Sequence, residues 1–261
     1  MSSIRPAAVA GTFYPSDPDE LRGMLALYLQ DAGSDSAIPR AMILPHAGYI
    51  YSGPVAASGY ASLLADKAAF QRVVLLGPAH QVAFTGIAAP TATTFMTPLG
   101  PVAVDQEAIN RLMTFPQVTL LDEAHRLEHS LEVHLPFLQV TLEAFTLVPL
   151  VVGDSDAESV CEVIEALASD PGTLIIVSSD LSHYHDYDTA VRLDAATTGK
   201  IESLDFKTIG YDHACGRNPV NGLLLYAQRH GMHANTLDLR NSGDTAGPRD
   251  QVVGYGAYAF S

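Results

Sequence analysis

Three apolar segments of the chain each lead into a histidine. They are "AMILPHAG", "RVVLLGPAH" and "TLIIVSSDLSH", which carry His46, His80, Asp180 and His183. Imidazole nitrogens bind metal ions and transfer protons near neutral pH, and a nearby carboxylate can orient them. Any one of these histidines could merely cap a strand, but the repetition favours a shared site. We therefore predict that the four side chains meet at one edge of a sheet.

A further candidate for chemistry is Cys215 in "HACGRNPV". We expect Asn218 and Pro219 to begin a helix, as N-cap and first helical residue. A thiol beside a helix N-terminus gains thiolate character, and Arg217 would add to that effect. The alternative is a buried, inert thiol. The other cysteine, Cys161, stands among apolar residues at helical spacing and is predicted to pack in the core.

The segment "EHSLEVHLPF" carries four polar side chains among apolar neighbours: Glu128, His129, Glu132 and His134. It lacks the HExxH spacing of a zinc helix, so it does not by itself predict a metal site. Because buried polar groups need partners, two interpretations stay open: a network that braces the core, or direct contact with a substrate. Three other histidines stand in polar or terminal contexts and are expected at the surface: His125, His230 and His233.

The composition of the 261-residue chain is that of a folded globular protein, with 48% hydrophobic and 16% charged residues. The net charge of −15 argues against nucleic acid or an anionic membrane as a partner. The apolar runs are too short to span a bilayer, and the N-terminus lacks the pattern of a secretory signal. Two cysteines provide no disulfide framework, so we expect a cytoplasmic protein.

Predicted helices and strands alternate along the chain. Helices are expected at residues 16–33, 53–70 and 218–231, among others, and buried strands at residues 41–44, 72–77 and 173–179. This alternation predicts one α/β domain over residues 1–261, with a central sheet flanked by helices on both faces. Residues 31–39 are expected to form a surface loop. The final strand, in "VVGYGAYAF", alternates its side chains and is expected at an edge of the sheet.

Six blocks of the sequence resemble the signature blocks of the Memo family, which is named for a mediator of cell motility in animals. The blocks are "RPAAVAGTFYPSDPDEL", "PHAGYIYSGPVAASGYASL", "LLGPAHQ", "EHSLEVHLPFLQ", "SSDLSHYHDY" and "HACGRNPVNGLL". The resemblance extends from about residue 5 to the C-terminus. Bacterial and archaeal members are often found with a radical-SAM protein and an AMMECR-type protein, so the resemblance implies such partner proteins.

The Memo family shares its fold with the class III extradiol dioxygenases, which use non-haem Fe(II). The resemblance therefore implies a single α/β domain with a central mixed sheet. Carried over motif by motif, it implies that the metal ligands are His46, His80 and Cys215.

The same resemblance assigns roles to four more residues. Asp180 and His183 would be catalytic residues in the metal pocket, with His183 placed like the general base of the dioxygenases. His129 resembles a further pocket histidine of those enzymes. His129 and Tyr51 would contact the substrate.

Cys215 marks a departure from the dioxygenases, which have a carboxylate at the corresponding position. Thiolate is a softer ligand than carboxylate, and it shifts the metal preference toward Cu(I), Zn or thiolate-bound iron. We expect Fe(II), with Cu(I) and Zn as alternatives. The dioxygenase fold does not by itself imply cleavage of an aromatic ring.

Three functions remain open at this point. The first is a redox metalloprotein, an oxygenase-like non-haem iron or copper enzyme that acts on an unknown small substrate. The second is a non-catalytic module that binds a peptide or a metal. Animal Memo proteins are described as binding phosphotyrosine peptides, and Tyr51 and Arg217 could serve that purpose. The third is a cysteine-dependent hydrolase, in which Cys215 would be the nucleophile beside a histidine and Asp180.

Overall fold

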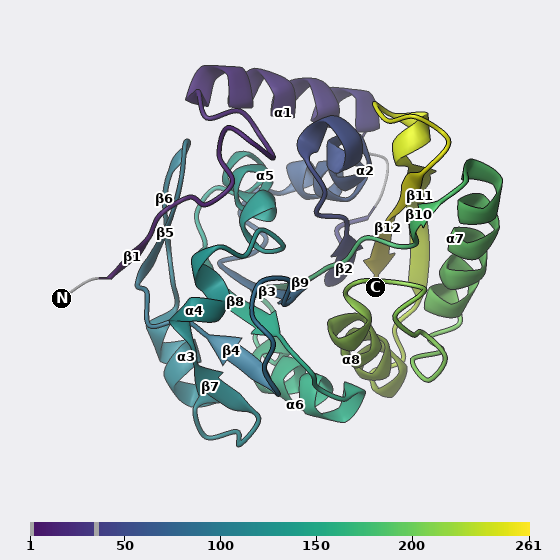
Figure 1. Ribbon diagram of the computed structural model, residues 1–261. Helices are drawn as coiled ribbons and strands as arrows, with labels where there is room; N and C mark the ends of the chain where they lie inside the picture. The colour runs from purple at the N-terminus through teal and green to yellow at the C-terminus, as the bar shows by residue number, and fades with distance from the viewer. Residues whose placement is uncertain (1–2, 34–36) are drawn as a thin grey trace.

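A mixed sheet of nine strands forms the centre of the computed structural model, which describes residues 3–33 and 37–261 (Figure 1). Its middle consists of four parallel strands, in the order β2 (Ala41–Leu44), β9 (Thr173–Ser178), β3 (Arg72–Pro78) and β8 (Thr146–Val152). These strands are buried almost throughout, as expected for apolar strands covered on both faces. The predicted α/β fold with a mixed sheet is confirmed.

Antiparallel pairings extend the sheet on both sides. On one side, β12 (Val252–Phe260) pairs with β2 and also with β10 (His183–His185) and β11 (Ala234–Asn241). On the other side, β4 (Ile87–Ala89) pairs with β8 and with β7 (Val118–Leu120). A separate small sheet, which the sequence pattern does not predict, consists of β1 (Ile4–Arg5), β5 (Thr94–Thr97) and β6 (Gly100–Ala103).

The edge position expected for the final strand is wrong, because β12 lies inside the sheet. It is buried almost throughout, and β2 and β11 both pair with it. The alternation in its sequence comes from small residues that leave room for neighbouring side chains. A Cβ at Gly254 would lie 2.0 Å from Oδ2 of Asp194, a buried residue of α7 (Tyr187–Glu202). The pattern thus reflects close packing rather than one solvent-exposed face.

Helices cover both faces of the central sheet, as the alternation of elements predicts (Figure 1). Three of them lie together on one side: α1 (Pro18–Ala32), α2 (Tyr49–Tyr60) and α5 (Leu135–Thr141). On the other side, α6 (Ala157–Ala168) and α8 (Arg217–Arg229) pack against each other and against β9. Two short helices, α3 (Gln106–Leu112) and α4 (Asp122–Arg126), lie near β4 and β7. Cys161 is fully buried in α6, which confirms its predicted place in the core.

The helix predicted over residues 53–70 begins and ends earlier than expected. α2 starts at Tyr49, and after Tyr60 the chain tightens into a 3-10 helix, η1 (Ala61–Ala65). The sequence places Pro54 in the first turn, where proline is best tolerated. The helix instead begins a turn before Pro54, at Tyr49, whose side chain is buried in the core.

Two further points concern the limits of the elements. The loop predicted at residues 31–39 includes residues 34–36, which lie outside the described residues. Among the helices of the described residues, none combines the length and the apolar character needed to cross a membrane.

Candidate metal centre

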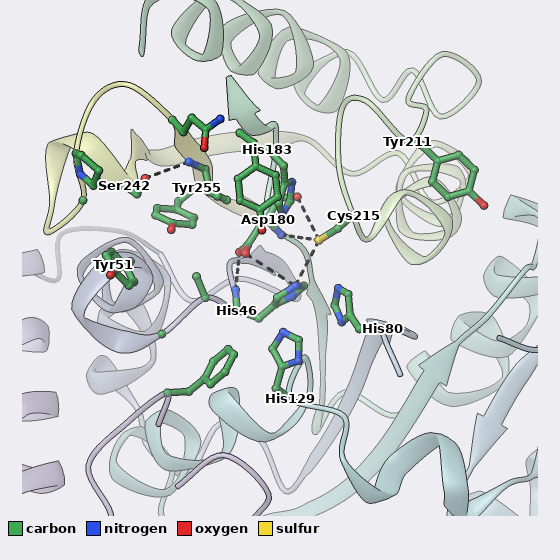
Figure 2. Close-up of a pocket in the computed structure, with 18 residues that line it drawn as sticks. His46, Tyr51, His80, His129, Asp180, His183, Tyr211, Cys215, Ser242 and Tyr255 are labelled. Carbon is green, nitrogen blue, oxygen red and sulfur yellow. Dashed lines mark hydrogen bonds and ion pairs between the residues drawn. The ribbon is translucent and has the colours of Figure 1, made fainter. Parts of the chain in front are cut away.

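The carboxyl ends of β2, β9 and β3 lie side by side, so the loops that follow these strands meet at one edge of the sheet. Together with neighbouring segments they enclose a cavity of about 760 Å³ (Figure 2). All the predicted site residues line this cavity: His46, Tyr51, His80, His129, Asp180, His183 and Cys215. Segments far apart in the sequence therefore share one cavity.

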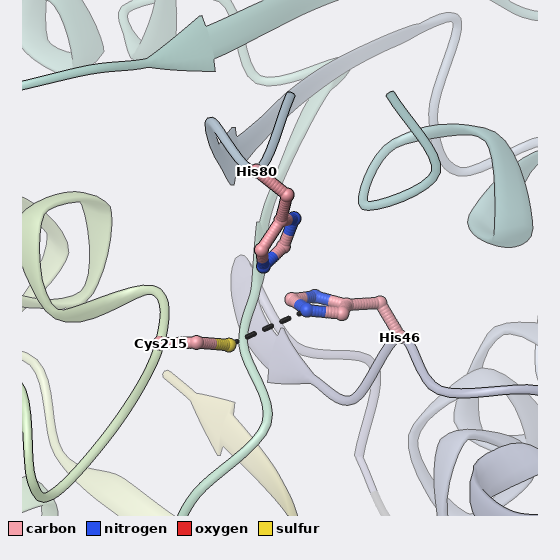
Figure 3. Close-up of side chains that lie close together, drawn as sticks. All are labelled: His46, His80 and Cys215. Carbon is pink, nitrogen blue, oxygen red and sulfur yellow. Dashed lines mark hydrogen bonds between the residues drawn. The ribbon is translucent and has the colours of Figure 1, made fainter. Parts of the chain in front are cut away.

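His46 is buried, and both of its ring nitrogens have close neighbours. Its Nδ1 lies 2.6 Å from Ser178 Oγ, and its Nε2 lies 3.3 Å from Cys215 Sγ (Figure 3). Its backbone N–H donates to Asp180 Oδ1 at 2.8 Å. Burial and the surrounding histidines hold the pKa of His46 well below its usual value, so the ring is neutral. Neutral imidazole is the form that binds metal ions.

His80 is oriented by Glu128. One oxygen of Glu128 lies 2.8 Å from His80 Nδ1, and the other accepts the backbone N–H of His80 at 2.6 Å. Burial alone would raise the pKa of Glu128, but hydrogen bonds from His80 and Ser130 outweigh it and lower that pKa to about 2. An ionised carboxylate only accepts hydrogen bonds, so Nδ1 of His80 carries the proton. Its Nε2 is thereby left free for a ligand.

His46, His80 and Cys215 each offer one donor atom, and the three atoms lie within 4.8 Å of one another (Figure 3). Donors that are each about 2.0–2.3 Å from one ion lie roughly 3–4 Å apart. The distance of 3.3 Å between His46 and Cys215 falls in that range. Two imidazoles and a thiol form a donor set that suits a transition-metal ion.

His129 stacks on His80, with ring centroids 4.6 Å apart, and lies in a T-shaped arrangement with the ring of His46. The ring of Phe13 packs against that of His129, with the two centroids 4.7 Å apart. Burial lowers the pKa of His129 to about 4, so the ring is neutral at pH 7. The donors of His80, Glu128 and His129 form a second close group. Because Glu128 already accepts two hydrogen bonds from His80, we assign it an orienting rather than a metal-binding role.

Asp180 and His183 face the same cavity from the segment after β9 (Figure 2). Burial raises the pKa of Asp180 to about 6, although the N–H of His46 donates to it. His183 Nδ1 lies 2.8 Å from the carbonyl oxygen of Leu181. A carbonyl oxygen can only accept, so Nδ1 carries a proton, and in the neutral form of the ring Nε2 of His183 has the free lone pair.

Cys215 lacks the thiolate character expected from the sequence. Burial and the nearby carboxylate of Asp180 raise the pKa of its thiol to about 12. The predicted helix start is also wrong by two residues: Gly216, not Asn218, is the cap of α8. Asn218, the predicted cap, instead donates to the carbonyl oxygen of Gly153 at 2.7 Å. Cys215 would therefore lose its proton on binding a metal, rather than before.

Gly216 allows Cys215 to approach the end of β9. A Cβ at this position would lie 2.6 Å from the carbonyl oxygen of Ser178 and 2.7 Å from Cβ of Ser179. The N–H of Gly216 also donates to Ser179 Oγ at 3.0 Å. A residue without a side chain is needed for this close contact.

The polar residues of the segment 128–134 divide between the cavity and the core. His129 lines the cavity, whereas Glu128 is buried beside it and contacts the cavity residue His80. Glu132 and His134, in a short 3-10 helix, η2 (Glu132–His134), are fully buried and form hydrogen bonds with other buried groups. The second half of the segment thus braces the core, while the first half lines the cavity through His129 and orients His80 through Glu128.

His125 is buried, which contradicts the surface position expected for it. Its exposed fraction is 2%, and its Nε2 donates to the carbonyl oxygen of Ala88 at 3.0 Å. Within the described residues its Nδ1 has no hydrogen-bond partner. Burial lowers the pKa of His125 to about 4. The charged residues around His125 in the sequence suggest a surface position, but α4 turns this side chain toward β4. His230 and His233 are exposed, as expected.

The cavity also contains residues that sequence analysis missed. Tyr184 and Tyr211 are largely exposed, whereas Tyr255 is buried in the wall (Figure 2). Tyrosines are common in both cores and surfaces, so their spacing in the sequence carries no signal for this site. The sequence marks Glu128 as a polar residue among apolar neighbours, but nothing in the local sequence indicates that its partner is His80.

Comparison with known proteins defines the family. The profile of the family described as Memo-like protein matches residues 5–259. The chain belongs to the Memo family. A MEMO1 family protein of Archaeoglobus fulgidus is 39% identical over 272 residues, which cover 98% of this chain and 99% of the relative. One of Saccharolobus solfataricus is 36% identical over 279 residues, which cover 97% and 98%. The resemblance carried by the six sequence blocks is thereby confirmed.

Proposed function

We propose that this Memo family protein is a metal-dependent redox protein, an oxygenase-like enzyme whose ion is held by His46, His80 and Cys215. The observation that carries the proposal is the convergence of these three donor atoms in one cavity. We propose Fe(II) as the ion, with Cu(I) and Zn as alternatives that a thiolate also accommodates. When bound, iron or copper would supply Lewis acidity and one-electron chemistry.

The residues around the donors would orient a substrate and move protons. The free Nε2 of His183 would take a proton from the substrate, while its Nδ1–H stays on the carbonyl oxygen of Leu181. Asp180 holds the backbone of the loop that carries His46. Tyr51 and His129 line the space beside the donors, where a small molecule would pack. The cavity volume is typical of a small-molecule site.

One observation favours a second candidate, a cysteine-dependent hydrolase. His46 Nε2 lies 3.3 Å from Cys215 Sγ, which is within reach of a nucleophile and its base. The charge states oppose this candidate, because burial raises the pKa of Cys215 to about 12 and keeps His46 neutral. In addition, Nδ1 of His46 contacts Ser178, so Asp180 does not orient the ring as in a catalytic triad.

No comparable observation favours a phosphopeptide-binding module. Phosphotyrosine is usually recognised by arginine clusters. Among the described residues, no lysine or arginine lines the large cavity. Arg217 instead lies over the ring of Tyr211, 3.5 Å from its centroid, and lines a smaller neighbouring cavity.

Metal binding by protein purified without oxygen tests the proposal. Cys215→Ser should lower the affinity for Fe(II) and Cu(I) by more than about tenfold, because a hydroxyl replaces the thiolate ligand. Cys161→Ala is the matched control, since it removes the buried thiol of α6 and should leave metal affinity unchanged. Unchanged affinity in Cys215→Ser would refute the ligand assignment. A hydrolase would lose activity in that variant without any change in metal content, and a peptide-binding module would keep its peptide affinity.

A further inference from the structure

Four buried side chains beside the cavity form a continuous series of hydrogen bonds, which we call the buried relay: Tyr60, His134, Ser178 and His46. Tyr60 Oη lies 2.8 Å from His134 Nδ1, and His134 Nε2 lies 2.9 Å from Ser178 Oγ. Ser178 Oγ in turn lies 2.6 Å from His46 Nδ1. All four side chains are at most 2% exposed. Only His46 lines the cavity, so the other three do not contact a substrate there.

The positions of the protons in the relay follow from Ser178. Its Oγ has three close partners, and the third is the carbonyl oxygen of Ser130 at 2.6 Å. A carbonyl oxygen can only accept, and a hydroxyl has one proton to donate. The Ser178 O–H therefore points to Ser130. The two remaining contacts of Oγ must be hydrogen bonds that it accepts, from His46 Nδ1–H and His134 Nε2–H.

The state of both imidazoles is thereby defined. His134 carries its proton on Nε2, so its Nδ1 has a lone pair that accepts the O–H of Tyr60. His46 carries its proton on Nδ1, so its Nε2 has the lone pair that faces Cys215. This tautomer of His46 is the less stable one for a free histidine, in which the proton prefers Nε2. The surrounding protein must therefore select it.

We propose that Ser178 and His134 are positioning residues that hold His46 in the Nδ1–H tautomer and so present Nε2 as a metal donor. This proposal rests on the proposed metal centre. Ser178 selects the tautomer, because it accepts the Nδ1 proton. His134 restrains the Ser178 side chain, because its Nε2–H donates to Oγ, the same atom that accepts the Nδ1 proton of His46.

The relay also explains why the two ligand histidines have different partners. The side chain of His80 is 28% exposed and is oriented by the carboxylate of Glu128. His46 is buried and already has the carboxyl group of Asp180 nearby. A second carboxylate there would have to be desolvated next to the first, which is costly. A neutral hydroxyl selects the same tautomer without adding a charge.

A network that merely braced the core would change stability, but it would not control the His46 tautomer. Proton–nitrogen correlation NMR on metal-free protein with isotope-labelled histidine distinguishes the two cases, because the pattern of each ring identifies its tautomer. In the wild type we expect His46 as Nδ1–H and His134 as Nε2–H. In Ser178→Ala, His46 should shift toward the Nε2–H tautomer. The affinity for Cu(I), measured against a competing chelator, should fall by about 10–100-fold.

Two variants serve as controls. Ser62→Ala removes another buried hydroxyl, one that donates to the carbonyl oxygen of Gly59, and should leave both the tautomer and the affinity unchanged. Tyr60→Phe removes the far end of the relay and should also leave His46 as Nδ1–H, because Ser178 still accepts from it. His134→Phe should keep the tautomer but lower the affinity by less than Ser178→Ala does.

The result that would overturn the proposal is an Nε2–H tautomer of His46 in the wild type. An unchanged tautomer and Cu(I) affinity in folded Ser178→Ala would overturn it as well. If Ser178→Ala does not fold, the tautomer of His46 in the wild type still decides. A loss of affinity in Cys215→Ser without one in Ser178→Ala would refute the relay alone. Unchanged affinity in Cys215→Ser would instead refute the metal centre, whatever the tautomer of His46.

Discussion

Both carboxylate oxygens of Glu128 are engaged by His80, one through the ring Nδ1 and the other through the backbone N–H. One acidic side chain therefore fixes the tautomer of a candidate ligand and also the loop that carries it. The two residues are 48 positions apart, so this relationship depends on the fold. It makes Glu128 the residue outside the donor set whose replacement is most informative.

Glu128→Gln should weaken metal binding by about 10–100-fold, because an amide is a poorer acceptor for the Nδ1 proton of His80. Competition titration with a metal chelator measures the change. Glu123→Gln is the matched control, since Glu123 is exposed on α4 and pairs with Arg126. Equal affinities of wild type and Glu128→Gln would show that His80 does not need this carboxylate.

Cys215→Asp should change which metal is preferred. A carboxylate is a harder ligand than a thiolate, so this variant should bind Fe(II) better and Cu(I) worse than the wild type. Parallel titrations with both ions, without oxygen, give the ratio of the two affinities. If that ratio stays the same in Cys215→Asp, ligand softness does not determine metal choice in this cavity.

His183→Ala should keep the metal and lose turnover, because we assign His183 a proton-transfer role and not a ligand role. Metal analysis gives the first quantity. Oxygen consumption by the iron-loaded protein with a panel of small molecules gives the second. His233→Ala, which removes an exposed imidazole, should change neither. If His183→Ala loses its metal to the same extent as Cys215→Ser, His183 is a ligand.

His125 should make the free energy of unfolding depend on pH. Burial lowers its pKa from 6.5 to about 4 in the folded protein, so between these values the unfolded chain binds more protons. The stability that His125 contributes is therefore present above pH 6.5 and is lost as the pH falls toward 4. The loss should be about 3 kcal/mol. Denaturant titrations of metal-free protein at several pH values measure it.

His125→Gln keeps a donor for the carbonyl oxygen of Ala88 but cannot titrate. Between pH 6.5 and 4, this variant should lose less stability than the wild type. Other buried histidines contribute equally to both proteins, so the difference between the two curves isolates His125. Parallel curves would mean that His125 is not the group responsible.

Local sequence was enough to predict the features that depend on short segments. A buried strand followed by a histidine occurs at His46 and His80, and parallel strands bring such ends to one edge of a sheet. The six blocks were enough to recognise the family, and apolar residues at helical spacing placed Cys161 in the core. Each of these inferences uses neighbours in the sequence or a general rule of α/β sheets.

Only the tertiary structure decided the environment of each side chain. The protonated thiol of Cys215, the buried position of His125 and the interior place of β12 depend on contacts between distant segments. The same is true of Ser178, whose single proton determines the tautomers of two histidines. Burial and hydrogen-bond partners control pKa and tautomer, and both arise when the chain folds. The sequence therefore determined which chemical groups are present near the cavity, and the fold determined their protonation states.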